Sequence, residues 1–82
     1  MADKELLVIT AEECGELVQT CCKILRWGPE KGNVEKLMEE AGDVQCMINL
    51  LIEKKVFTKE DIDARVQVKR DKLKIYSKLI DE

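Results

Sequence analysis

Two groups of acidic residues stand out because they lie inside apolar segments with helical periodicity, where charged side chains are usually excluded. Within each group, carboxylates three or four residues apart fall on one face of a helix. Carboxylates that meet between two helices repel one another and resist removal from water unless a cation holds them. The pattern therefore predicts a divalent metal site between two helices, with the candidate residues Glu12, Glu13, Glu16, Glu39, Glu40 and Asp43.

The composition limits what kind of protein carries these acids. With 82 residues, the chain has room for one domain, residues 1–82, and for one small core that favours stabilisation by oligomer formation. Charged residues make up 38% of it and hydrophobic residues 45%, which favours a helical protein over a disordered one. The net charge is −3 and the basic residues are scattered, so duplex nucleic acid is not expected as a partner.

The apolar runs and the cysteines indicate where the protein works. No apolar run approaches the roughly 20 residues that a membrane-spanning helix needs, and residues 1–5 do not resemble a signal peptide. We therefore expect no membrane partner and a cytoplasmic location. The four cysteines are expected to be reduced, because long helices do not suit a small disulfide-rich scaffold.

Apolar periodicity divides the chain into three expected helices, at about 3–27, 34–55 and 59–79. Segment 28–32 contains two glycines and a proline, so it is expected to connect the first two helices, with Asn33 as the next N-cap. Thr58 and the acids that follow it are expected to cap the third helix. The predicted fold is all-α: an antiparallel helical hairpin with a third helix packed on it, assembling into an oligomeric helical bundle.

Projection of the helices separates the acids by face. Four of them fall within or at the edge of the apolar arcs, Glu12 lies further round, and Glu39 points to solvent. A tight connection between two antiparallel helices also sets their register. Residues of the two helices whose numbers sum to about 59 are then expected at the same height along the pair. The acids expected to converge, and to bind Mg²⁺ or Mn²⁺ through oxygen ligands, are Glu13, Glu16, Glu40 and Asp43. The alternative is that they are solvated or paired with lysines.

The two acidic groups also match two motifs in order. Residues 12–16 read E-E-x-x-E and residues 40–43 read E-x-x-D, and with this separation the chain resembles the MazG-like all-α NTP pyrophosphatases. The segment Arg26-Trp27-Gly28, together with the closing stretch 69–76, resembles the short single-domain members from bacteria and phages. The resemblance covers nearly the whole chain.

This resemblance implies an activity and roles for the acids. The expected reaction is Mg²⁺-dependent cleavage of a nucleoside triphosphate between its α and β phosphates, by a homodimer or homotetramer. By motif, Glu13, Glu16, Glu40 and Asp43 would be metal ligands, and Glu12 would bind through water or orient the nucleophile. Glu12 and Glu13 are the catalytic candidates, because a carboxylate can serve as the base that histidine, which the chain lacks, cannot supply.

Further polar residues are weaker candidates for contacts with substrate. Lys69 lies in the apolar seam of the third helix, where it either binds phosphate or extends its ammonium group to water, and Lys72 is similar. Asn49 could contact a ribose or a base, or simply lie at a polar edge. Trp27 is assigned to packing or a loop, and the three cysteines within apolar stripes are assigned to packing: Cys14, Cys21 and Cys46.

Two functions of other classes stay open beside the enzyme. One is a non-catalytic protein that binds or senses a nucleotide through the same acidic pocket. The other is a helical interaction module whose acids are surface residues. Metal binding separates both site-based functions from the interaction module, and release of pyrophosphate separates the enzyme from the binder.

Overall fold

The computed structural model describes residues 4–30 and 32–81, which form three α-helices and, within those ranges, no strand. The helices are α1 (Lys4–Trp27), α2 (Asn33–Glu53) and α3 (Lys59–Tyr76). The predicted all-α class is confirmed. None of these described helices combines the length and the apolar character that crossing a membrane requires.

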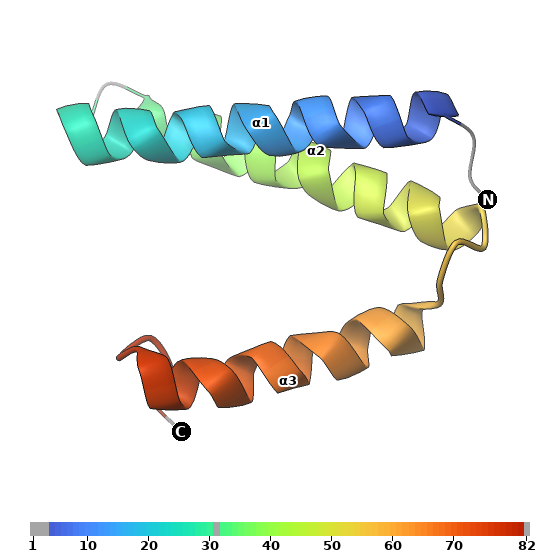
Figure 1. The fold of residues 1–82 in the computed structure, drawn as a ribbon. Helices are drawn as coiled ribbons and strands as arrows, with labels where there is room; N and C mark the ends of the chain where they lie inside the picture. The colour runs from blue at the N-terminus through green and yellow to red at the C-terminus, as the bar shows by residue number, and fades with distance from the viewer. Residues whose placement is uncertain (1–3, 31, 82) are drawn as a thin grey trace.

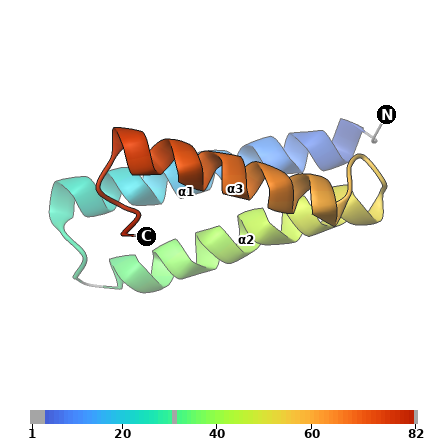
Figure 2. The same ribbon diagram turned by 90° about the horizontal axis from the view of Figure 1, so that it is seen from below.

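Helices α1 and α2 pack side by side and run in opposite directions, joined by a short connection (Figures 1 and 2). Gly28 and Gly32 adopt positive φ angles of 89° and 80°, a conformation that glycine reaches without steric cost. Asn33 was expected to be the N-cap of α2, but Gly32 occupies that position. The Asn33 side chain instead donates a hydrogen bond to the carbonyl oxygen of Gly28, 2.8 Å away, and so ties the connection to the helix.

The start of α3 follows the sequence prediction closely. The backbone N–H of Asp61 donates to Thr58 Oγ1, and the Asp61 side chain accepts from the N–H of Thr58, which completes a capping box. Helix α3 ends at Tyr76, three residues before the expected end at Leu79. The reason is local: Ser77 leaves helical geometry, and both its N–H and its hydroxyl group donate to the carbonyl oxygen of Leu73.

Substitution of Thr58 by alanine is expected to loosen the first turn of α3. Loss of an N-cap side chain costs about 1 kcal/mol, which corresponds to roughly fivefold faster opening. Amide hydrogen exchange measured by NMR should therefore accelerate about fivefold at Asp61 in the Thr58→Ala variant, while the amides in the middle of α1 serve as the internal control. Unchanged exchange at Asp61 would show that the cap does not hold this turn.

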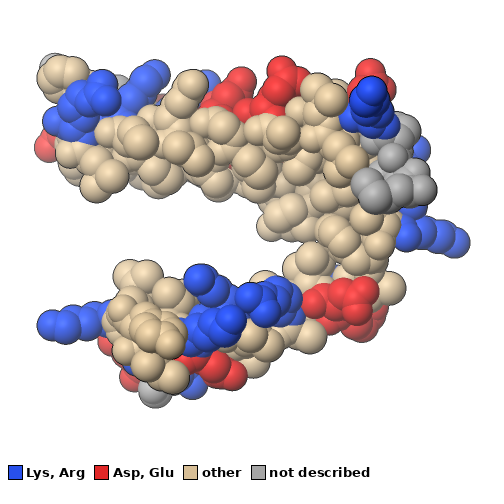
Figure 3. Space-filling model, viewed as in Figure 1, with Lys and Arg blue, Asp and Glu red and all other residues tan. Residues whose placement is uncertain are grey.

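The position of α3 differs from the expected packing of a third helix on the first two. Residues 54–58 carry the chain away from α2, and α3 makes no extensive contact with α1 or with α2. Figure 1 shows α3 apart from the α1–α2 pair, and Figure 3 shows open space between them. The seam that was expected to hold α3 leaves Val66 52% exposed and Tyr76 82% exposed.

The core is small and lies at one end of the α1–α2 pair. Leu6, Met47 and Leu51 are its buried hydrophobic residues, and Leu50, Val56 and Phe57 pack against them. Much of the predicted apolar stripe is exposed instead, because α1 and α2 cover only one strip of each other. The cysteines are exposed free thiols rather than packed residues, and the large exposed hydrophobic residues include Val18, Leu25, Val34, Met38, Ile75 and Leu79.

Candidate metal centre

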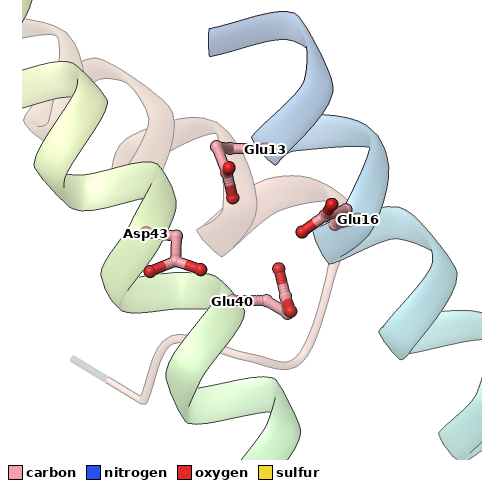
Figure 4. A group of neighbouring side chains, drawn as sticks. All are labelled: Glu13, Glu16, Glu40 and Asp43. Carbon is pink, nitrogen blue, oxygen red and sulfur yellow. The ribbon is translucent and has the colours of Figure 1, made fainter. Parts of the chain in front are cut away.

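Four carboxylates from α1 and α2 meet between these helices, and we call them the four-acid cluster: Glu13, Glu16, Glu40 and Asp43. Each residue offers an oxygen atom, and these atoms all lie within 4.8 Å of one another. Figure 4 shows the two glutamates of α1 facing the two acids of α2. The spacing of three residues within each helix places both members of a pair on the face that meets the other helix. All four acids assigned to the inward faces from sequence therefore converge.

Burial of one member makes this cluster different from an ordinary acidic surface, although Glu16 and Asp43 are exposed and Glu13 is half-buried. Glu40 is 2% exposed, although charged residues are rarely buried to that extent without a partner. Its Oε2 atom and the Oε2 atom of Glu13 are both buried and accept no hydrogen bond from any residue in the described ranges. A buried carboxylate oxygen without a partner loses the hydration it had in the unfolded chain. A cation that takes these oxygens as ligands would remove that cost, so the residues fit a hard divalent ion.

Lys36 partly compensates the charge of the cluster. Its Nζ atom lies 3.0 Å from Glu40 Oε1 and 3.9 Å from Glu39 Oε2. The hydrogen bond from Lys36 lowers the pKa of Glu40, although burial acts in the opposite direction, and Glu40 in turn raises the pKa of Lys36. Glu40 is therefore held as a carboxylate. Lys36 was missed from sequence, although its position one helical turn before Glu40 could have indicated the pair.

Glu13 and Glu16, the two members of the cluster that α1 contributes, bind protons more tightly than usual. Removal from water raises the pKa of Glu13, and the nearby charges of Asp43 and Glu40 add to this effect. Hydrogen bonding to Glu40 raises the pKa of Glu16, followed by the charge of Glu13. Because Lys36 stabilises Glu40 as an anion, a proton that enters this part of the cluster resides on Glu16 rather than on Glu40.

These shifts predict that mild acid stabilises the fold when no metal is present. Glu13 and Glu16 hold protons more tightly in the folded chain than in the unfolded chain, so the free energy of unfolding rises as pH falls from 7 toward 4.5, their ordinary pKa. Glu40 has a lowered pKa, and its stabilising contribution is lost only below 4.5. In EDTA, the melting temperature is therefore expected to be higher at pH 5 than at pH 7.

Glu13→Gln is the matched test of that expectation. The neutral amide removes repulsion at pH 7, so the variant should melt about 2–5 °C above the wild type in EDTA and show a smaller gain at pH 5. Glu12→Gln makes the same change of charge on an exposed neighbour and should raise the melting temperature less. A lower melting temperature for Glu13→Gln at pH 7 would contradict the repulsion inferred here.

The remaining predicted site residues lie outside the cluster. Glu12 is exposed beside it, and its charge contributes to the raised pKa of Glu13. The Glu39 side chain is 61% exposed, as its face predicted. Asn49 is exposed and accepts a hydrogen bond from Gln45 Nε2 at 3.0 Å. The structure does not bring the exposed residues Lys69 and Lys72 of α3 to the acids of this chain, and Trp27 is 70% exposed at the end of α1.

Comparison with known proteins adds no identification to this geometry. No protein-family model, no curated protein and no solved structure matches the chain. The cluster itself indicates the chemistry. It offers carboxylate oxygens from two helices as ligands, and two of these oxygens are buried without a hydrogen bond from the described residues.

Proposed function

We propose that the protein is a nucleoside triphosphate pyrophosphohydrolase that depends on Mg²⁺, or on Mn²⁺ in its place. The observation that carries the proposal is the pair of buried, unpartnered oxygens, Glu13 Oε2 and Glu40 Oε2, within a cluster of four carboxylates. Hard oxygen ligands are those that Mg²⁺ and Mn²⁺ take, and Mg²⁺ commonly shares such sites with substrate phosphates. The order and spacing of the acids, E-E-x-x-E and then E-x-x-D, support this reaction over other uses of the ion.

The four-acid cluster would hold the ion, with Glu13 and Glu16 on one side and Glu40 and Asp43 on the other. When bound, Mg²⁺ supplies charge neutralisation for the triphosphate and lowers the pKa of a coordinated water. Glu12 is exposed at the margin of the cluster, where its carboxylate can accept a proton from the attacking water. Glu13 would take part both as a ligand and in holding that water, because one of its oxygens belongs to the cluster and its Oε2 atom accepts no hydrogen bond from the described residues. The products would be a nucleoside monophosphate and pyrophosphate, in the cytoplasm.

A homodimer or homotetramer forms part of the proposal. Many large hydrophobic side chains of α1, α2 and α3 are exposed, whereas a stable monomer usually covers most of such a stripe. Packing of a second copy would complete an oligomeric helical bundle, and it is also the arrangement that could bring Lys69 or Lys72 of one chain near the acids of another. Asn49 is the remaining candidate for substrate contact.

Two other functions fit part of the same observations. A non-catalytic nucleotide-binding or nucleotide-sensing protein would use the same acids and the same ion. A helical interaction module would use the exposed apolar residues, but it gives no reason for a carboxylate that is 2% exposed.

Product analysis tests the proposed reaction. The purified chain with Mg²⁺ is incubated with a panel of ribo- and deoxyribonucleoside triphosphates, and the released anion is identified by ³¹P NMR. Monophosphate and pyrophosphate in equal amounts are expected. Release of single phosphate would assign another hydrolysis, and tight nucleotide binding without any product would favour the binding protein.

A further inference from the structure

The feature that the proposed reaction leaves unused is Lys36, whose ammonium group contacts the most buried acid of the cluster. Its Nζ atom lies 3.0 Å from Glu40 Oε1, and the Glu40 side chain is 3% exposed. The Lys36 side chain itself is 56% exposed, so its end reaches the cluster from solvent and has room to turn away. Lys36 thus holds a cationic group at the open side of a site that otherwise consists of acids.

The charges in this site explain why such a group is useful. Four carboxylates in close proximity disfavour one another, and Glu40 without a cation would be a buried, uncompensated charge. A divalent ion would compensate the same carboxylate, so the ammonium group and the ion compete for Glu40. Once the ion holds Glu40, a phosphate group bound beside it lies within reach of the displaced lysine and is of opposite charge.

We propose that Lys36 is a tethered cation of this site: it neutralises Glu40 until a divalent ion binds there, and it then pairs with the phosphates of the substrate. The first half of this proposal, in which Lys36 neutralises Glu40 until the ion replaces it, concerns the chain and the ion alone. The second half rests on the proposed function, because it needs a polyphosphate at the cluster. Lys36 is thereby a positioning residue for Glu40 and a binding residue for substrate.

The test measures the affinity for Mn²⁺ and the affinity for tripolyphosphate. Removal of the Lys36 ammonium group should raise the first and lower the second. In Lys36→Met, which keeps most of the aliphatic stem, Mn²⁺ alone should bind about two- to fivefold more tightly, because its competitor is gone. Inorganic tripolyphosphate, titrated in saturating Mn²⁺, should bind about tenfold more weakly, because a charged hydrogen bond is lost. Both affinities are measured by isothermal calorimetry. Lys36→Arg, which keeps the charge, should stay within about twofold of wild type in both titrations.

Lys59→Met is the matched control. Lys59 pairs with Asp63 across the same i, i+4 spacing at 2.8 Å, but on α3 and in an exposed position. Its substitution should change neither affinity. Weaker or unchanged binding of Mn²⁺ by folded Lys36→Met would overturn the competition for Glu40, and unchanged binding of tripolyphosphate would overturn the contact with phosphate.

Chemical labelling of the wild-type chain gives a second measurement that does not depend on the folding of a variant. Acetylation of lysine amines, followed by mass spectrometry, should become severalfold faster at Lys36 when Mn²⁺ is added and slower again when tripolyphosphate follows. Lys59 serves as the internal reference for reagent activity. A Lys36 rate that does not respond to Mn²⁺ contradicts the exchange even if the chain hydrolyses nucleotides, and a response to Mn²⁺ supports it even if the chain hydrolyses none.

Discussion

Mn²⁺ at about one hundred times its dissociation constant is expected to raise the melting temperature of this chain by about 10 °C or more. An ion that binds only the folded state at that concentration contributes about 2.7 kcal/mol. For a domain of this size, each kcal/mol shifts the melting temperature by about 4–8 °C. The ion would relieve repulsion within the four-acid cluster and supply a partner for two buried oxygens, Glu13 Oε2 and Glu40 Oε2, and both effects favour a low dissociation constant.

Differential scanning fluorimetry with a series of Mn²⁺ concentrations measures this shift, with Mg²⁺ expected to act in the same direction. Asp43→Asn removes one of the four carboxylates and should abolish most of the gain. Addition of excess EDTA should restore the melting temperature of the metal-free chain. A melting temperature that stays constant up to millimolar Mn²⁺ would contradict both the enzyme and the nucleotide-binding alternative.

Glu40→Gln is expected to reduce the release of pyrophosphate by at least about 100-fold. Loss of groups that merely orient a metal ligand costs 10–100-fold, so loss of a ligand should cost no less. The amide has the shape of the carboxylate and can still accept a hydrogen bond from Lys36, but it carries no charge for the ion. The defect should therefore appear in kcat as well as in apparent metal affinity.

Glu39→Gln is the control for that variant, since it makes the same change one residue earlier. Its side chain is 61% exposed, lies 3.9 Å from Lys36 and is not one of the four converging acids, so activity should stay within about twofold of wild type. Equal rates for wild type and Glu40→Gln would remove Glu40 from the site. A loss in Glu39→Gln as large as in Glu40→Gln would mean that general charge, rather than the geometry of the cluster, controls the rate.

The inward acids could be predicted from sequence because helical periodicity is a local property. An acid such as Glu40 that falls near the middle of an apolar arc is on the side of its helix that a neighbouring helix is expected to cover. The capping box at Thr58 is equally local, and its hydrogen bonds form as expected. The prediction of Asn33 as the N-cap of α2 was wrong because two neighbouring residues suit the end of a helix. Gly32 adopts the left-handed conformation and takes the N-cap position, and the Asn33 side chain donates to the carbonyl oxygen of Gly28 instead.

The position of α3 could not be predicted from its own pattern. An apolar seam indicates that a helix has a packing face, but not which surface covers that face. In this chain the seam includes Lys69 and the exposed residues Val66 and Tyr76, and α3 stands apart from α1 and α2. The contact between Lys36 and Glu40 was missed for a related reason: a lysine one turn from an acid is common on surfaces, and only burial of the acid makes the pair informative.

The proposed metal centre is tested most directly by an anomalous difference map from crystals of the full chain grown with Mn²⁺ and a non-hydrolysable nucleoside triphosphate analogue. We expect a Mn²⁺ peak bounded by Glu13, Glu16, Glu40 and Asp43, with the phosphates of the analogue beside the ion. A map in which Mn²⁺ is bound by other residues, or in which the four-acid cluster holds no ion at saturating Mn²⁺, would contradict this expectation.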